Sequence, residues 1–94
     1  MQFAIAAILK PGVERELFEL SDQFNEHIGP SGTNIRIAGV LRDEAGGRVG
    51  YLAIFEGDSI GQAQEWAGES PIFQAHLYDR LDIFEYEIEV GRLI

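Results

Sequence analysis

Two histidines are the only side chains of this sequence that titrate near neutral pH, so they are its candidates for proton transfer. His27 follows Phe24 by three residues in an apolar repeat, and it should lie beside the buried stripe of a helix. Either His27 or Asp22 could move protons, or His27 could be a helix-end histidine that the helix dipole stabilises. His76 is expected at a pocket edge or, more simply, half exposed.

Arg36 places a positive charge inside an apolar strand, between Ile35 and Ile37. Such a charge is costly to bury unless it is paired. Its guanidinium group could hold a substrate carboxylate through two parallel hydrogen bonds. It could also pair with an acidic neighbour, such as a glutamate of the last strand. The excess of carboxylates in the chain favours this second interpretation.

Three aromatic side chains, Tyr51, Trp66 and Phe73, could bind a substrate in an apolar pocket, although packing in the core is the more frequent role of each. The sequence has no cysteine and only two histidines, which excludes thiolate sites and all-histidine metal sites within one chain. Gly46-Gly47 is expected in a hairpin turn and not in a phosphate-binding loop. No metal and no other cofactor are therefore predicted.

Charge and hydropathy exclude several classes of partner. The chain has 16 acidic and 7 basic residues, a formal charge of −9, and the basic residues form no patch. Nucleic acids and anionic membranes are bound through clustered Lys and Arg, so neither is an expected partner. No apolar stretch approaches the roughly 20 residues that span a bilayer. The apolar start of the chain lacks the flanks of a signal peptide. The expected location is the cytoplasm.

The spacing of apolar residues predicts the elements that position these side chains. Strands are expected where apolar residues run or alternate, and helices where they recur every three or four positions. Ser59 fits the N-cap of one helix, and Ser70 with Pro71 starts a shorter one. The predicted order is strand 2–9, helix 13–28, strand 34–42, strand 48–56, helix 59–67, a short helix from 70, and strand 82–90.

This β-α-β-β-α-β order is typical of the ferredoxin-like α+β fold, a four-stranded antiparallel sheet with helices on one face. The 94 residues fit one domain, residues 1–94. Residues 2–9 are apolar on both faces of the strand, which indicates a central position. Because helices cover only one face of the sheet, the other would expose a large apolar patch. A homodimer that buries this patch is therefore predicted.

Several short motifs resemble the YciI-like (YCII-related) family of the dimeric α+β-barrel superfamily. They are Ile37-Ala38-Gly39, the runs GYLAIF at 50–55 and SIGQAQEWA at 59–67, and Ser70-Pro71-Ile72-Phe73, which resembles the family's Asp-Pro-Phe/Tyr turn. The resemblance covers nearly the whole chain. It implies a barrel made of two packed sheets, with a pocket between sheet and helices in each subunit.

Some members of that family are thought to act through a His–Asp pair whose histidine lies on the first helix. The matching positions here, 20–22, hold Leu, Ser and Asp. Three hypotheses stay open. The first is an isomerase- or lyase-type enzyme for a small anionic or aromatic compound, in which His27 or Asp22 moves protons and Arg36 holds a carboxylate. The others are a non-catalytic binding or accessory domain, which the missing histidine favours, and a cofactor-free small monooxygenase.

Overall fold

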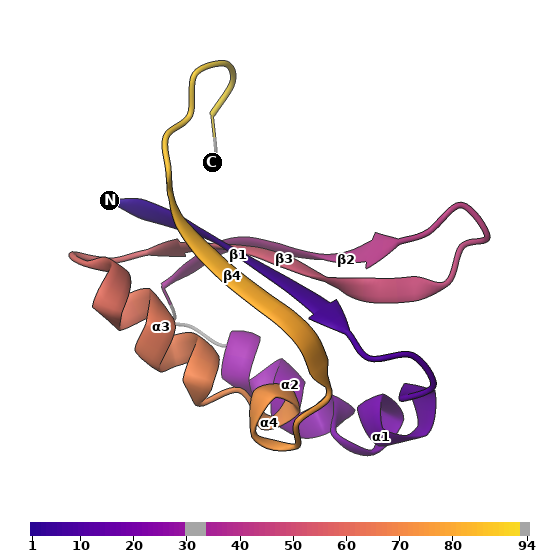
Figure 1. The fold of residues 1–94 in the computed structure, drawn as a ribbon. Coiled ribbons are helices and arrows are strands. Elements are labelled where there is room, and N and C mark those ends of the chain that lie inside the picture. The colour runs from indigo at the N-terminus through magenta and orange to yellow at the C-terminus, as the bar shows by residue number, and fades with distance from the viewer. Residues whose placement is uncertain (30–33, 93–94) are drawn as a thin grey trace.

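The computed structural model describes residues 1–29 and 34–92, and within them the predicted β-α-β-β-α-β order is confirmed. The four strands form one antiparallel sheet in the order β2-β3-β1-β4. The described helices lie on one side of this sheet (Figure 1). The elements are β1 (Gln2–Leu9), α1 (Glu14–Glu19), α2 (Ser21–Ile28), β2 (Ile35–Arg42), β3 (Arg48–Glu56), α3 (Ile60–Gly68), α4 (Pro71–Gln74) and β4 (Tyr78–Tyr86).

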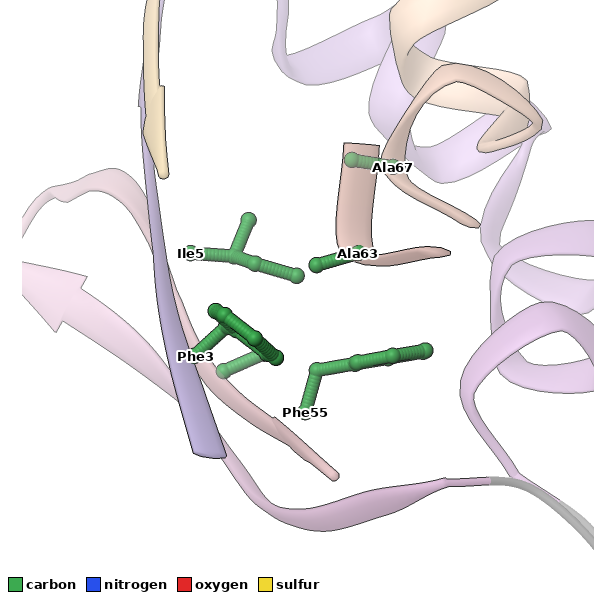
Figure 2. Packing of buried hydrophobic residues seen from close by; sticks show 6 residues of the cluster. Phe3, Ile5, Phe55, Ala63 and Ala67 are labelled. Atoms are coloured by element: carbon green, nitrogen blue, oxygen red, sulfur yellow. The ribbon is translucent and has the colours of Figure 1, made fainter. Parts of the chain in front are cut away.

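Strand β1 is central, as its two-sided apolar sequence predicts, with β3 paired to one edge and β4 to the other. Its alternate side chains face the helices and are buried. Figure 2 shows Phe3 and Ile5 of β1 and Phe55 of β3 pointing toward Ala63 and Ala67 of α3. Both alanines are buried, and their small side chains let the helix approach the sheet closely. This cluster fixes the position of α3.

A second cluster joins the end of β1 to α1, α2 and α4. This cluster contains the apolar stripe that the sequence predicts for residues 13–28. The prediction of one continuous helix over these residues is wrong, because the segment forms two helices, α1 and α2. The helix is interrupted at Leu20, whose backbone has φ −97° and ψ 2°. The Ser21 hydroxyl donates to the Phe18 carbonyl at 2.7 Å, a side-chain bond that competes with the helical ladder. The stripe is made of Val13, Leu17, Leu20, Phe24 and Ile28.

Strand β4 begins and ends four residues earlier than the predicted strand 82–90. Its last pair joins Tyr86 to Gln2, the first residue of β1, so the ladder stops where β1 begins. Its beginning is hidden in the sequence because Asp79 and Arg80 interrupt the apolar alternation, and the register shifts between Ile8 and Leu9. Residues 87–92 leave the sheet on the side away from the helices (Figure 1).

The sheet face opposite the helices carries exposed apolar side chains. Ile37 of β2, Leu52 of β3 and Phe84 of β4 are 53%, 41% and 61% exposed. By their pairing they share one face of the sheet and flank the small side chains of β1. The two-faced apolar pattern of the sequence is therefore present in the fold.

The two predicted capping serines are confirmed. Ser59 accepts from the Gln62 amide at the start of α3, and Ser70 accepts from the Ile72 amide at the start of α4. Helix α4 ends in a Schellman motif, in which the His76 and Leu77 amides bond back to the carbonyls of Phe73 and Ile72. His76 accordingly has a left-handed backbone with φ +60° and follows the helix instead of lying on it.

Candidate functional site

An apolar cavity lies between the sheet and helices α2, α3 and α4. Its volume is about 20 Å³, which is room for a single water-sized group. Every strand contributes to the wall, and the helical side is built from α2 and α3 together with the cap of α4. The lining residues are Ile5, Ala7, Phe24, Ile28, Ala38, Tyr51, Leu52, Ala53, Trp66, Ala67, Ser70, Tyr78 and Leu81.

Two hydroxyl groups, those of Ser70 and Tyr78, lie side by side in this apolar wall. Ser70 is 3% exposed and is the buried polar residue of the described chain. Its oxygen accepts from the Ile72 amide at 3.3 Å, and Tyr78 lies close enough for Ser70 to affect the pKa of its phenol. Burial raises the pKa of Tyr78 to about 12, against a smaller lowering effect of the bond to Ser70. Tyr78 is therefore a neutral phenol at physiological pH.

Tyr51 supplies a third hydroxyl from the middle of β3. Its ring packs against Phe24 of α2 with centroids 4.7 Å apart. The exposed Arg48 guanidinium lies 5.2 Å from the centroid of the same ring, in cation–π range. Burial raises the pKa of Tyr51, and Arg48 opposes this effect. The cavity thus holds aromatic faces together with neutral hydroxyl groups.

Trp66 of α3 separates the cavity from an open groove. Its indole lines both the cavity and the groove, and His27 and Glu69 also line the groove. The His27 ring stacks on the indole with centroids 4.3 Å apart and planes 19° from parallel. Sequence reasoning predicts a largely buried Trp66 against the sheet, but the side chain is half-buried because only one side of it meets the core.

His27, next to the cavity, also has a perturbed environment. Its Nε2 atom is buried and has no hydrogen-bond partner among the described residues. Burial lowers the pKa of His27, against smaller raising effects of a hydrogen bond to the Trp66 backbone and of the Glu69 carboxylate. His27 is therefore neutral at pH 7, the protonation state that a general base requires.

The structure separates the predicted site residues into two groups. Tyr51 and Trp66 line the cavity, and His27 lies behind Trp66. Arg36 is exposed on the edge strand β2, with Nε 3.8 Å from Glu56 Oε1 of β3. Phe73 is 41% exposed on α4, and Asp22 is exposed on α2. None of these last three belongs to the described lining of the cavity.

Sequence reasoning misses the functional potential of Ser70 and Tyr78. Ser70 is expected only as a helix cap, and Tyr78 falls in what the sequence predicts to be a connection. The signal that pointed to them is weak: a capping serine eight residues before a tyrosine does not by itself indicate contact. The turn made by α4 brings the two hydroxyls together, and that turn depends on Leu77 returning to the core.

In residues 1–29 and 34–92, no group of three or more His, Asp or Glu side chains is placed to hold a metal ion. Among the helices described, none is long and apolar enough to cross a membrane.

Comparisons with known proteins identify the fold. No family model matches the sequence, and neither does any curated protein. A solved structure of 5-chloro-2-hydroxyhydroquinone dehydrochlorinase from Burkholderia phenoliruptrix, in complex with 2,5-dihydroxybenzoquinone, matches with a TM-score of 0.83 and 17% identity over 93% of this chain and 94% of that one. The heme-degrader MhuD from Mycobacterium tuberculosis, with two hemes bound, matches with a TM-score of 0.51 and 19% identity over 98% and 99%. At these identities the likeness confirms the fold class.

Proposed function

We propose that this protein is a homodimeric, YciI-like α+β barrel that binds a small aromatic molecule in the cavity between sheet and helices. One observation carries the proposal: three residues that bear hydroxyl groups, Tyr51, Ser70 and Tyr78, line a cavity whose other walls are apolar and aromatic. Small-molecule sites combine an apolar lining with a few placed polar groups in this way. Two of the structural neighbours are solved with planar conjugated ligands, 2,5-dihydroxybenzoquinone and heme, which is compatible with the same use here.

Homodimer formation is supported by the uncovered sheet face. Ile37, Leu52 and Phe84 lie on three different strands of that face and are each at least 41% exposed. Apolar side chains gathered on one face of a small sheet favour association with a second copy. The helices already cover one face of the sheet, so a partner subunit would pack against the other face (Figure 1). We also propose that the protein is cytoplasmic, as the sequence predicts.

The YciI-like assignment is supported by where the matching motifs lie. The SIGQAQEWA run forms α3 with its cap, and it supplies both buried alanines and Trp66. The Ser70-Pro71-Ile72-Phe73 motif forms α4, and its serine reaches the cavity. Both motifs therefore build the candidate site. Leu20, the first of the positions 20–22 that match the family's histidine, packs against the core beside Leu17 and Phe24.

Ligand entry requires movement, because an aromatic ring needs several times the present 20 Å³. Trp66 is the wall residue suited to move, since its outer side meets an open groove and its contact there is the stack on His27. Pockets of this kind open when a ligand stabilises a minor conformation. We propose that the ligand enters past the Trp66 indole.

Titration with phenol, followed by nuclear magnetic resonance, tests the proposed site. Trp66 is the single tryptophan of the chain, so its indole N–H gives one resolved signal. Saturable shifts are expected for this signal and for the methyl groups of Ala53 and Ala67, with one common dissociation constant. The methyl groups of Ala4 and Ala6 lie on the opposite face and serve as the control in the same sample. Shifts that do not saturate, or that occur only at the control methyls, would contradict the proposal.

Proton-transfer catalysis by His27 is a second candidate function. The lowered pKa and the unpartnered Nε2 atom favour it, because both suit a general base next to a movable wall. His27→Gln should then abolish turnover of a bound substrate while leaving its affinity within about twofold. The matching variant Asp22→Asn should have no effect, since Asp22 is exposed. A His27→Gln protein with full turnover would exclude this role.

A further inference from the structure

We infer that the cavity selects uncharged planar aromatic molecules that carry a carbonyl or hydroxyl oxygen, and that it rejects their carboxylate analogues. The inference rests on the proposed function, and it narrows the ligand class from anionic or aromatic to neutral. Its basis is the chemical character of the cavity wall, residue by residue.

The Ser70–Tyr78 pair keeps one hydrogen-bond donor free for a ligand. Each hydroxyl has one O–H donor and can accept as well. The Ser70 oxygen already accepts from the Ile72 amide, and the Tyr78 hydroxyl lies close enough to Ser70 for one bond to form between the two side chains. If Ser70 donates to Tyr78, the Tyr78 O–H is unused; if Tyr78 donates to Ser70, the Ser70 O–H is unused. In either direction the pair can donate to an oxygen atom in the cavity.

The cavity wall offers no charge to a carboxylate. Among the described residues that line it, every side chain is apolar, aromatic or a neutral hydroxyl. Arg48 contacts the Tyr51 ring but is exposed and does not belong to the lining. Arg36, the residue that the sequence suggests for holding a carboxylate, is exposed and lies near Glu56 of β3. A buried carboxylate without a cation loses its hydration and gains only neutral hydrogen bonds, which is strongly unfavourable.

The aromatic rings in the cavity wall favour a planar ligand. Phe24, Tyr51 and Trp66 stand on three different elements around the same space. Flat rings pack against such faces in offset or tilted arrangements, as Phe24 and Tyr51 already do at 52° between planes. A planar ligand that displaces the indole can pack against the Phe24 and Tyr51 rings and reach the hydroxyl pair.

Benzamide and benzoate test the selection, because they have nearly the same size and shape and differ in charge at pH 7. We expect benzamide to give saturable shifts of the Trp66 indole signal and benzoate to bind at least tenfold more weakly. Tyr78→Phe should weaken benzamide binding by about fivefold, the effect of one hydrogen bond. Tyr51→Phe is a second variant in case Tyr78→Phe unfolds. Tyr86→Phe, on the uncovered face, is the matched control and should leave the affinity unchanged.

The outcomes separate this inference from the proposed function. Benzoate binding as tight as benzamide binding, particularly if Arg48→Gln abolishes it, would overturn the neutral-ligand inference and leave the cavity as the site. Benzamide affinity that is unchanged in both tyrosine variants would overturn the role of the hydroxyls. If phenol, benzamide and benzoate all fail to shift the indole signal, the proposed function itself is wrong and the inference fails with it.

Discussion

The two faces of the sheet are built from the same strands and have similar hydrophobicity, yet they differ sharply in burial. Phe3 of β1, on the covered face, is 1% exposed. Phe84 of β4, which lies on the uncovered face and pairs with Ala4, the residue after Phe3, is 61% exposed. The difference arises from α3 and its two buried alanines, which pack on one face only (Figure 2). Residue type alone therefore does not tell which face is core and which is an interface.

The largest effect is expected on the covered face. Phe3→Ala should lower the free energy of unfolding by about 3–5 kcal/mol, because it leaves a cavity among fully packed neighbours. Chemical denaturation at a fixed protein concentration measures the loss. Phe18→Ala is the matched control, since Phe18 is 81% exposed on α1, and it should change stability by less than about 0.5 kcal/mol. Equal losses in the two variants would contradict the assignment of Phe3 to the core.

On the uncovered face, Phe84→Glu should weaken dimer formation and spare the fold. A charge at the centre of an apolar interface should cost about 2 kcal/mol or more, which is roughly 30-fold in the dimer dissociation constant. Sedimentation velocity across a range of concentrations measures it. Phe18→Glu adds the same charge to the helical side and should not alter association. A wild-type protein that stays monomeric at micromolar concentration would exclude the proposed interface.

An intermediate effect is expected at Trp66, which belongs to both the core and an open groove. Trp66→Ala should cost about 1.5–3 kcal/mol, roughly half of what a fully buried aromatic loses. Unfolding followed by circular dichroism is suitable, because the variant has no tryptophan fluorescence. Trp66→Phe should recover most of the loss by keeping a ring against Phe55. A loss as large as that of Phe3→Ala would show that the indole is fully packed in solution.

The smallest effect concerns pH. The folded-state pKa of His27 is lowered, so the unfolded chain binds a proton more readily than the folded one. Stability should therefore be complete above the ordinary value of 6.5 and should decline as pH falls from there through the lower folded-state pKa. Thermal unfolding between pH 7 and pH 5 should show a shallower decline in His27→Gln than in wild type. His76→Asn, which tolerates the left-handed backbone, should retain the wild-type slope. An unchanged slope in His27→Gln would be evidence against the burial of this ring.

Much of the fold follows from local patterns in the sequence. The two-sided apolar run at 2–9 predicts a central strand, and the spacing from Val13 to Ile28 predicts the stripe that packs against the sheet. Ser59 and Ser70 mark the helix starts because a side-chain oxygen must satisfy a free amide there. The break at Leu20 and the bounds of β4 were not predictable in this way. They depend on a competing Ser21 bond and on where the partner strand ends.

The sequence by itself determined the periodicity of each element, the order of the elements and the two-faced sheet, because these depend on neighbours along the chain. It also singled out Tyr51 and Trp66, which line the cavity, and His27, which stacks on Trp66. Only the tertiary structure decided that Arg36 lies away from the cavity and that Ser70 meets Tyr78. Those relations join residues from separate elements, and their distances are set by packing α2, α3 and α4 on the sheet. Local spacing carries no information about such distances.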